Sequence, residues 1–455
     1  MLNTDVLEKA CGGRWLGACP EGIGRICTDS RNLQQGDVFI ALRGPSFDGH
    51  AFGAQVANRA LALIGDSEGI QQWKGLAIPQ LEVGNTLDAL GHIAHAYRCE
   101  LRDTCVMAIT GSYGKTTVRA MLAYALNRLG IRISATTANN NNLIGVPQTL
   151  LSIPKNTDVA LVECGISEAG EMARLSNMVS PDMAILTGIG LAHGAGLGSL
   201  ASIAVEKYRL IEALRDHGLA IFGDGVAAHL SATATMEHDG KWGDEKKVQW
   251  RLTASPDDKR KATVILQWQG NQARVNLALP APHWAANMAL VATVVLSWAT
   301  RYGRSIGLSE VAEALAGWQA VPHRLCPIFT DDGMLILDDA YNANPASMQA
   351  ALDTLLALSG SSMAVLGDMA ELGSDSAAAH RMLDISGVDH VLLVGTAMRV
   401  LADRVADCHW CANVDDALVY LHNIKHTTFD AVLVKASRSM NFERIVAMLV
   451  AEKKE

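Results

Sequence analysis

The feature that most constrains the fold is an apolar strand, a glycine turn and a helix in direct succession. Residues 105–109 are continuously apolar, as in a strand buried on both faces, and apolar side chains recur at helical spacing from Val118 to Leu129. The turn between them is formed by Gly111, Ser112, Tyr113, Gly114, Lys115, Thr116 and Thr117. Its glycines let backbone N–H groups approach phosphates, its lysine offsets their charge, and its hydroxyls can bind Mg²⁺. The sequence therefore predicts an ATP-binding loop.

The spacing of this loop differs from the common nucleotide-binding pattern. That pattern needs a glycine five residues before the second glycine, and Ile109 stands there. A surface turn could contain the same residue types by chance. The buried strand before the turn and the amphipathic helix after it argue against that alternative. We therefore expect a shorter variety of phosphate-binding loop.

The chain is long enough for several domains. Its 455 residues exceed the roughly 250–300 that one hydrophobic core supports. Apolar runs alternating with helical patterns predict an α/β fold of three domains, bounded near residues 1–100, 101–321 and 322–455. We expect a small N-terminal α/β domain, a central doubly wound ATPase domain and a C-terminal Rossmann-like domain. The supporting strand-like segments are residues 37–42, 159–162, 183–186, 334–338, 363–367, 390–395 and 431–434, with polar antiparallel strands within 239–275.

Charge and cysteine content exclude several classes of protein. The net charge of −9 and the absence of a basic cluster argue against nucleic-acid binding. The most apolar run, residues 289–299, is too short to cross a bilayer, and the N-terminus lacks the apolar stretch of a secretion signal. Nine scattered cysteines are typical of a reducing compartment. We expect a monomeric cytoplasmic protein without membrane insertion.

The short loop resembles that of the Mur ligases, a family of ATP-dependent enzymes that form amide bonds in peptidoglycan precursors. Further strings resemble successive motifs of that family, so the resemblance covers nearly the whole chain. These strings are residues 136–147, 162–165, 192–193 and 203–207, with His283 and Asn287.

Two C-terminal strings, residues 338–348 and 365–373, resemble one member of this family. That member joins D-alanyl-D-alanine to a UDP-N-acetylmuramoyl tripeptide, and the resemblance implies these two small-molecule substrates. Related alternatives are the ligase that adds the third amino acid and folylpolyglutamate synthase. An alternative of another class is a nucleotide-switched ATPase whose third domain recruits a partner, but Glu163, His193 and Lys207 would then be coincidental.

The resemblance also implies two Mg²⁺ ions and a catalytic group of Lys115, His193 and Lys207. Thr116 would bind one ion, and Glu163, His193 and a carbamylated Lys207 would bind the other. From the residues alone, a structural role for His193 is favoured over metal binding, because Mg²⁺ prefers oxygen ligands. A lysine at position 207 would ordinarily lie on the solvated face of a helix. Carbamylation would convert its ammonium into an oxygen donor.

The resemblance assigns further residues to the substrates. Arg324 and Asp339 would contact ATP from the third domain, which would close to exclude water. His283 and Asn287, four residues apart, would meet the adenine, although a helix–helix contact would require the same spacing. The remaining substrate-binding residues are Ser30, Arg31, Asn139, Asn141, Asn142, Tyr341, Asn344 and Ser347, of which the first two belong to a pattern resembling a uridine-nucleotide site.

The chain departs from the family pattern at five positions. Tyr113 replaces a common asparagine, Ala138 and Ala436 replace glycines, and Ala195 and Arg209 replace acids near the second metal. The expected nucleotide, metal and lysine positions are all retained.

Overall fold

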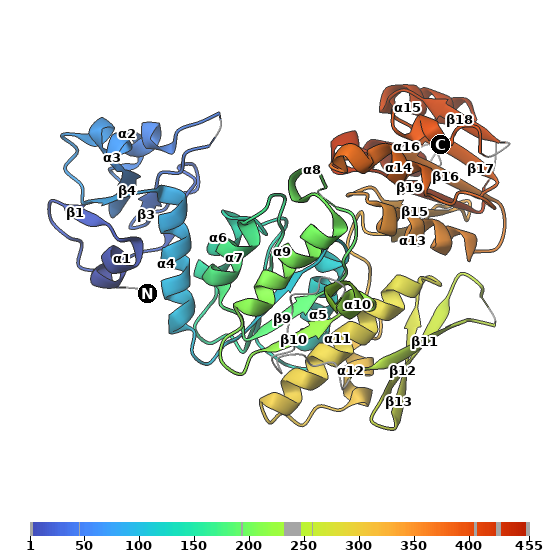
Figure 1. The fold of residues 1–455 in the computed structure, drawn as a ribbon, viewed down its shortest axis with the longest axis horizontal. Helices are drawn as coiled ribbons and strands as arrows, with labels where there is room; N and C mark the ends of the chain where they lie inside the picture. The colour runs from blue at the N-terminus through green and yellow to red at the C-terminus, as the bar shows by residue number, and fades with distance from the viewer. Residues whose placement is uncertain are drawn as a thin grey trace.

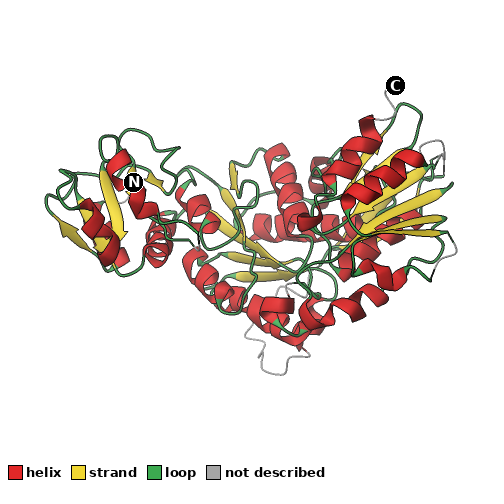
Figure 2. Ribbon diagram, turned by 90° about the horizontal axis from the view of Figure 1, so that it is seen from above, coloured by secondary structure: helices red, strands yellow, loops and turns green. Residues whose placement is uncertain are grey.

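The structure is a computed structural model that describes residues 3–44, 46–192, 194–231, 247–256, 258–404, 407–424 and 429–451. Three α/β parts follow one another along the long axis, from the N-terminal part in blue to the C-terminal part in red (Figure 1). Seen from above, each part has strands flanked by helices (Figure 2). Among the helices of the described ranges, none combines the length and the apolar character that a membrane span requires.

The N-terminal part contains a five-stranded sheet of order β1-β5-β4-β3-β2, in which β1 alone is antiparallel to its neighbour. Its elements are α1 (Thr4–Cys11), β1 (Arg14–Leu16), β2 (Ile26–Cys27), β3 (Val38–Ile40), α2 (Gly53–Val56), β4 (Ala62–Asp66), α3 (Ser67–Ile70), β5 (Gln80–Val83) and α4 (Thr86–Glu100). Helix α4 packs on α1 and also on helices α6 and α7 of the central part. Buried Arg98 of α4 donates to Val179 O at the end of α7 at 3.0 Å and to Asp182 Oδ2, just before β9, at 2.7 Å.

The central part is a parallel sheet of order β10-β9-β6-β8-β7. Its elements are β6 (Cys105–Thr110), α5 (Lys115–Arg128), β7 (Ile133–Ala135), α6 (Gly145–Leu151), β8 (Val159–Glu163), α7 (Glu171–Val179), β9 (Met183–Leu186), α8 (Gly194–Leu197), α9 (Leu200–Glu212), β10 (Leu219–Phe222) and α10 (Val226–Ser231). Along β6, Met107 and Ile109 face one core, whereas Val106 and Ala108 face another. Because both faces are covered, the continuous apolar character of this strand is explained.

Three antiparallel strands and two helices complete the central part. They are β11 (Gln249–Ala254), β12 (Ala262–Trp268), β13 (Asn271–Leu277), α11 (Pro282–Arg301) and α12 (Leu308–Leu315). The antiparallel strands expected within residues 239–275 are confirmed, although residues 232–246 lie outside the described ranges. The apolar run at 289–299 is confirmed as a buried helical segment, within α11.

The C-terminal part has a six-stranded sheet of order β14-β15-β19-β16-β17-β18, parallel except for β14. Its elements are β14 (Cys326–Phe329), β15 (Leu335–Asp339), α13 (Pro345–Leu356), β16 (Ser362–Gly367), α14 (Ser376–Arg381), β17 (His390–Val394), β18 (Cys408–Cys411), α15 (Val414–Asn423), β19 (Ala431–Lys435) and α16 (Glu443–Ala451). The α/β class and the parallel sheets predicted from the sequence are therefore confirmed.

Candidate active site

The loop between β6 and α5 depends on two glycines. Gly111 has φ 154°, and a Cβ there would lie 2.2 Å from Thr187 Oγ1. Gly114 has φ 79° and directly precedes α5. In the described part of the chain no side chain caps the start of this helix. Its first N–H groups can therefore donate to phosphate oxygens.

Hydrogen bonds hold this loop in place. The Ser112 N–H donates to Gly188 O at 2.8 Å, and the Ser112 hydroxyl donates to Gly190 O at 2.7 Å. Lys115 Nζ donates to Gly111 O at 2.7 Å. Burial lowers the pKa of Lys115, while the Glu163 carboxylate opposes that shift. The loop thus offers a ligand two positive features, the partly desolvated ammonium group of Lys115 and the first N–H groups of α5.

A cavity of about 660 Å³ lies between this loop and the C-terminal part. This is the size of a small-molecule site. Seventeen of the residues predicted from the sequence line it: Ser112, Tyr113, Gly114, Lys115, Thr116, Thr117, Asn139, Asn141, Asn142, Glu163, His283, Asn287, Arg324, Asp339, Tyr341, Asn344 and Ser347. Gly111, Lys207, Ser30 and Arg31 are not among the lining residues, and His193 lies outside the described ranges.

Glu163 occupies the centre of the polar groups at the carboxyl end of β8. The Thr116 hydroxyl lies 3.2 Å from each of its carboxylate oxygens. Asn141 Nδ2 donates to Oε1 at 3.0 Å, and Arg119 Nε donates to Oε2 at 3.2 Å. A carboxylate and a hydroxyl thus lie together beside the loop, and these are oxygen ligands of the type that Mg²⁺ prefers.

Lys207 is 2% exposed within α9. Burial, followed by repulsion from Lys115, lowers its pKa well below the ordinary value, against a smaller opposite effect of Glu206. The Glu206 carboxylate itself accepts from the N–H groups of Gly170 and Met172. The amine of Lys207 is therefore far more readily neutral than a surface lysine.

Residues of the C-terminal part reach the loop directly. The Arg324 guanidinium stacks 3.8 Å from the centre of the Tyr341 ring, and its Nη2 lies 3.5 Å from Thr116 Oγ1. Asn344 accepts from the Ser347 N–H as the cap of α13, and its own amide donates to Ser112 O at 3.3 Å. Asn344 thus joins the start of a C-terminal helix to the loop.

Asp339 binds two groups at once. Its Oδ1 accepts from the Leu325 N–H at 3.0 Å, and its Oδ2 accepts from Lys435 Nζ at 2.6 Å. Lys435 also lines the cavity, although the sequence interpretation gave it no role.

His283 and Asn287 lie on the first turns of α11, facing the cavity. His283 Nδ1 is buried and has no hydrogen-bond partner among the described residues. Burial lowers the pKa of His283 to about 4, so the ring is neutral at physiological pH. A neutral ring nitrogen without a partner is suited to a polar ligand group.

In the N-terminal part, Ser30 and Arg31 follow β2. The Arg31 guanidinium pairs with the Asp29 carboxylate at 2.9 Å. The neighbouring Thr28 accepts from Gln148 Nε2 of α6 at 2.6 Å, which ties this segment to the central part.

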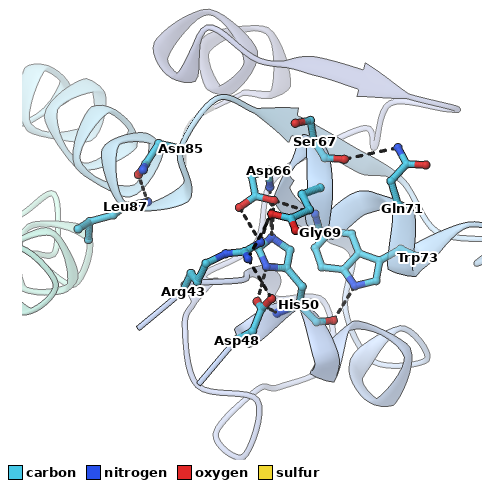
Figure 3. Close-up of polar contacts among 11 residues, drawn as sticks. Arg43, Asp48, His50, Asp66, Ser67, Gly69, Gln71, Trp73, Asn85 and Leu87 are labelled. Carbon is cyan, nitrogen blue, oxygen red and sulfur yellow. Dashed lines mark hydrogen bonds and ion pairs between the residues drawn. The ribbon is translucent and has the colours of Figure 1, made fainter. Parts of the chain in front are cut away.

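Also in the N-terminal part, His50 and its neighbours form an internal network of polar contacts (Figure 3). His50 Nδ1 lies 2.6 Å from Asp48 Oδ1, and its Nε2 accepts from the Asp66 N–H at 3.2 Å. Nε2 is therefore the acceptor and Nδ1 carries the proton. The His50 carbonyl accepts from Trp73 Nε1 at 2.8 Å, and Arg43 pairs with Asp66. These contacts fix the loop conformation from within the N-terminal part.

Ala138 adopts φ 47° in the loop after β7, a left-handed conformation that favours glycine. We expect Ala138→Gly to raise the free energy of unfolding by up to about 1 kcal/mol, because it removes this strain. Urea denaturation of both proteins measures the difference. The matched control is Ala57→Gly, where φ is −55°, which should be destabilising. A loss of stability in Ala138→Gly would contradict the expectation.

Two site residues were missed from the sequence. Arg119 lies one helical turn after Thr116, and this spacing places both side chains on one face of α5. Lys435 is the charged residue that follows the apolar segment 431–434, at the carboxyl edge of the sheet. That position could have marked it as a ligand-facing residue.

Comparison with known proteins identifies three matching family models. The model described as "Mur ligase family, catalytic domain" matches residues 22–98, "Mur ligase middle domain" matches 109–295, and "Mur ligase, glutamate ligase domain" matches 323–438. The UDP-N-acetylmuramoyl-tripeptide--D-alanyl-D-alanine ligase of Escherichia coli is 32% identical over 439 residues, which cover 93% of each chain. The enzyme of the same name from Bacillus subtilis is 32% identical over 442 residues, with 93% of each chain covered.

Solved structures show the same similarity. MurF from Acinetobacter baumannii superposes with a TM-score of 0.86 at 30% identity, covering 98% of both chains. MurF from Thermotoga maritima in complex with ADP, at 23% identity, shows the same fold with a TM-score of 0.79 over 94% of this chain and 98% of that one. The match extends across all three parts of the molecule, and the chain belongs to the Mur ligase family.

Proposed function

We propose that this chain joins D-alanyl-D-alanine to UDP-N-acetylmuramoyl-tripeptide, with conversion of ATP to ADP and phosphate. The observation that carries the proposal is that one cavity is lined by residues of two segments. These are the loop at 111–117 and the string at 338–348 that resembles this ligase, which contributes Tyr341, Asn344 and Ser347. The curated relatives carry the name of this reaction.

The carboxylate of the tripeptide must first be activated, because a free carboxylate is a poor acyl donor. An oxygen of this carboxylate attacks the γ-phosphorus of ATP, ADP leaves, and an acyl phosphate forms. The dipeptide amine then attacks the acyl carbon, phosphate leaves, and the nitrogen loses a proton. Lys115 and Arg324 provide positive charge where the carboxylate must approach the triphosphate.

Magnesium would offset the remaining negative charge in the phosphoryl transfer. Two ions are proposed, one bound by Thr116 and one by Glu163, His193 and carbamylated Lys207. The carboxylate and hydroxyl gathered at Glu163 fit such an ion. Arg119 also pairs with this carboxylate, with its Nε 3.2 Å from Glu163 Oε2.

Other assignments follow from the same proposal. Residues 1–100 would bind the UDP group through Ser30 and Arg31, residues 101–321 would bind ATP, and residues 322–455 would bind the dipeptide and close over ATP. In the central part, Asn139, Asn141 and Asn142 would contact the substrate, and His283 with Asn287 would contact adenine. Gly111 would serve by permitting the loop conformation. We place this reaction in the cytoplasm and expect a monomer.

The deciding experiment combines the protein with ATP, Mg²⁺, D-alanyl-D-alanine and UDP-N-acetylmuramoyl tripeptides ending in either diaminopimelate or lysine. We expect ADP release that requires both peptide substrates, together with a pentapeptide product in the mass spectrum. ATP hydrolysis without any acyl acceptor would favour a nucleotide-switched ATPase instead. A product that forms only when a single amino acid replaces the dipeptide would assign the chain to another member of the family.

A further inference from the structure

The segment that joins the central and C-terminal parts has an unfavourable backbone at two positions. His323 has φ 61° and Leu325 has φ 55°, and both lie in the left-handed region that side chains other than glycine rarely adopt. Arg324 lies between them and lines the cavity. A conformation of this kind persists only where surrounding contacts enforce it.

Those contacts come from the C-terminal sheet. The Leu325 N–H donates to Asp339 Oδ1 at 3.0 Å, and the Tyr341 N–H donates to His323 O at 3.2 Å. Asp339 Oδ2 in turn accepts from Lys435 Nζ at 2.6 Å. A short chain of polar contacts therefore runs from Lys435 through Asp339 to the residue after Arg324.

Lys435 is 1% exposed, and its ammonium group donates hydrogen bonds to two oxygen atoms. The acceptors are Asp339 Oδ2 and Asn342 O, the latter at 2.9 Å. Its charge also balances the Asp339 carboxylate, which lies near enough to Arg324 to interact with that guanidinium. Without Lys435, Asp339 would be an uncompensated carboxylate that attracts Arg324 away from Thr116.

We infer that Lys435 is a positioning residue, which acts through Asp339 and the Leu325 backbone to direct Arg324 at the nucleotide-binding loop. The effect on ligation rests on the proposed function, whereas the effect on nucleotide binding does not. The inference predicts that Lys435 and Arg324 contribute through one shared interaction and not independently.

The test is a double-mutant cycle on the full chain, with the β,γ-methylene analogue of ATP and Mg²⁺ as probe in isothermal titration calorimetry. We expect Lys435→Met and Arg324→Ala each to weaken binding by about 10- to 100-fold, the range of a lost charge-assisted hydrogen bond. In the Arg324→Ala background, Lys435→Met should add no more than about a twofold loss. Losses that multiply would mean that Lys435 contacts the nucleotide itself and would overturn the inference.

A second variant separates charge balance from direct contact. In Asp339→Asn with Lys435→Met, the amide oxygen can still accept from the Leu325 N–H, and no buried carboxylate is left unpaired. The pair is compared with Asp339→Asn alone, because Asp339 itself lines the cavity. Lys435→Met should add little further loss of affinity in that background, and a further tenfold loss would contradict the mechanism. If Lys435→Met fails to fold, the neutral pair is tested with and without Arg324→Ala. Its affinity should then remain sensitive to Arg324→Ala, and an insensitive pair would refute the inference.

The matched control is Lys155→Met, a half-exposed lysine paired with Glu100 and remote from the cavity lining. It should bind the analogue as the parent protein does. KM for ATP and kcat are then measured for ligation, and Lys435→Met should change both in parallel with Arg324→Ala. If the parent protein forms no pentapeptide, the proposed function fails, while the binding cycle still decides the role of Lys435.

Discussion

Replacement of Lys115 by methionine should lower the ligation rate by about 10³-fold, the scale expected when a charge on a transferring phosphoryl group loses its partner. Methionine retains most of the length of the side chain but cannot donate to an oxygen. Within the described ranges, Lys115 Nζ donates to the Gly111 carbonyl of its own loop, so the side chain is available to bind a triphosphate. The rate is measured as ADP release in the complete substrate mixture.

The Lys115→Met variant should be at least as stable as the parent protein, although its activity should be much lower. Burial lowers the pKa of Lys115, so the ammonium is held at a cost that methionine does not incur. Thermal unfolding should therefore show a Tm at least as high as that of the parent protein. Lys74→Met, at an exposed position of the N-terminal part, is the control and should retain full activity. A Lys115→Met protein that keeps a tenth of the activity would contradict the assigned role.

The elements around the loop were predictable because their sequence signals are local. The apolar run at 105–109 became β6, and the 3.6-residue periodicity from Val118 became α5. No comparable local signal specifies the order of the strands in the central sheet. β6 lies between β8 and β9, although β7 follows it in sequence, because the order depends on how helices cover the two faces.

The candidate site was predictable where a residue belongs to a short motif, as Thr116, Glu163 and Arg324 do. Lys435 was missed because its role depends on a partner 96 residues away, Asp339. Arg119 was missed because an arginine on an amphipathic helix is usually solvated, and only the fold places it beside Glu163. Contacts between elements distant in sequence thus account for the site residues that the motifs did not reveal.

Removal of dissolved CO₂ should lower the activity of the parent protein, and added bicarbonate should restore it. Carbamylation requires the neutral amine, and burial together with Lys115 lowers the pKa of Lys207 well below 10.5. A larger fraction of this amine is therefore neutral at physiological pH than for an exposed lysine. Lys207→Met should lose roughly 100-fold or more of the ligation rate and should not respond to bicarbonate, because the metal would lose an oxygen donor.

The modification itself is observed by ¹³C NMR with labelled bicarbonate. The parent protein should give a carbamate signal that Lys207→Met lacks. A signal in both proteins would place the carbamate elsewhere, and full activity of Lys207→Met would refute the assignment. Lys155→Met again controls for the loss of a lysine at a half-exposed position.

The lowered pKa also predicts how stability depends on pH in CO₂-free buffer. Between the lowered folded-state pKa of Lys207 and its ordinary value of 10.5, the unfolded chain binds a proton at this amine that the folded chain does not. The unfolding free energy of the parent protein should therefore rise with pH across that window. Lys207→Met lacks this titration, so the difference in unfolding free energy between variant and parent should shift in favour of the parent as pH increases. Urea denaturation at several pH values measures the difference, and a difference independent of pH would show that the buried amine is not held neutral in the folded protein.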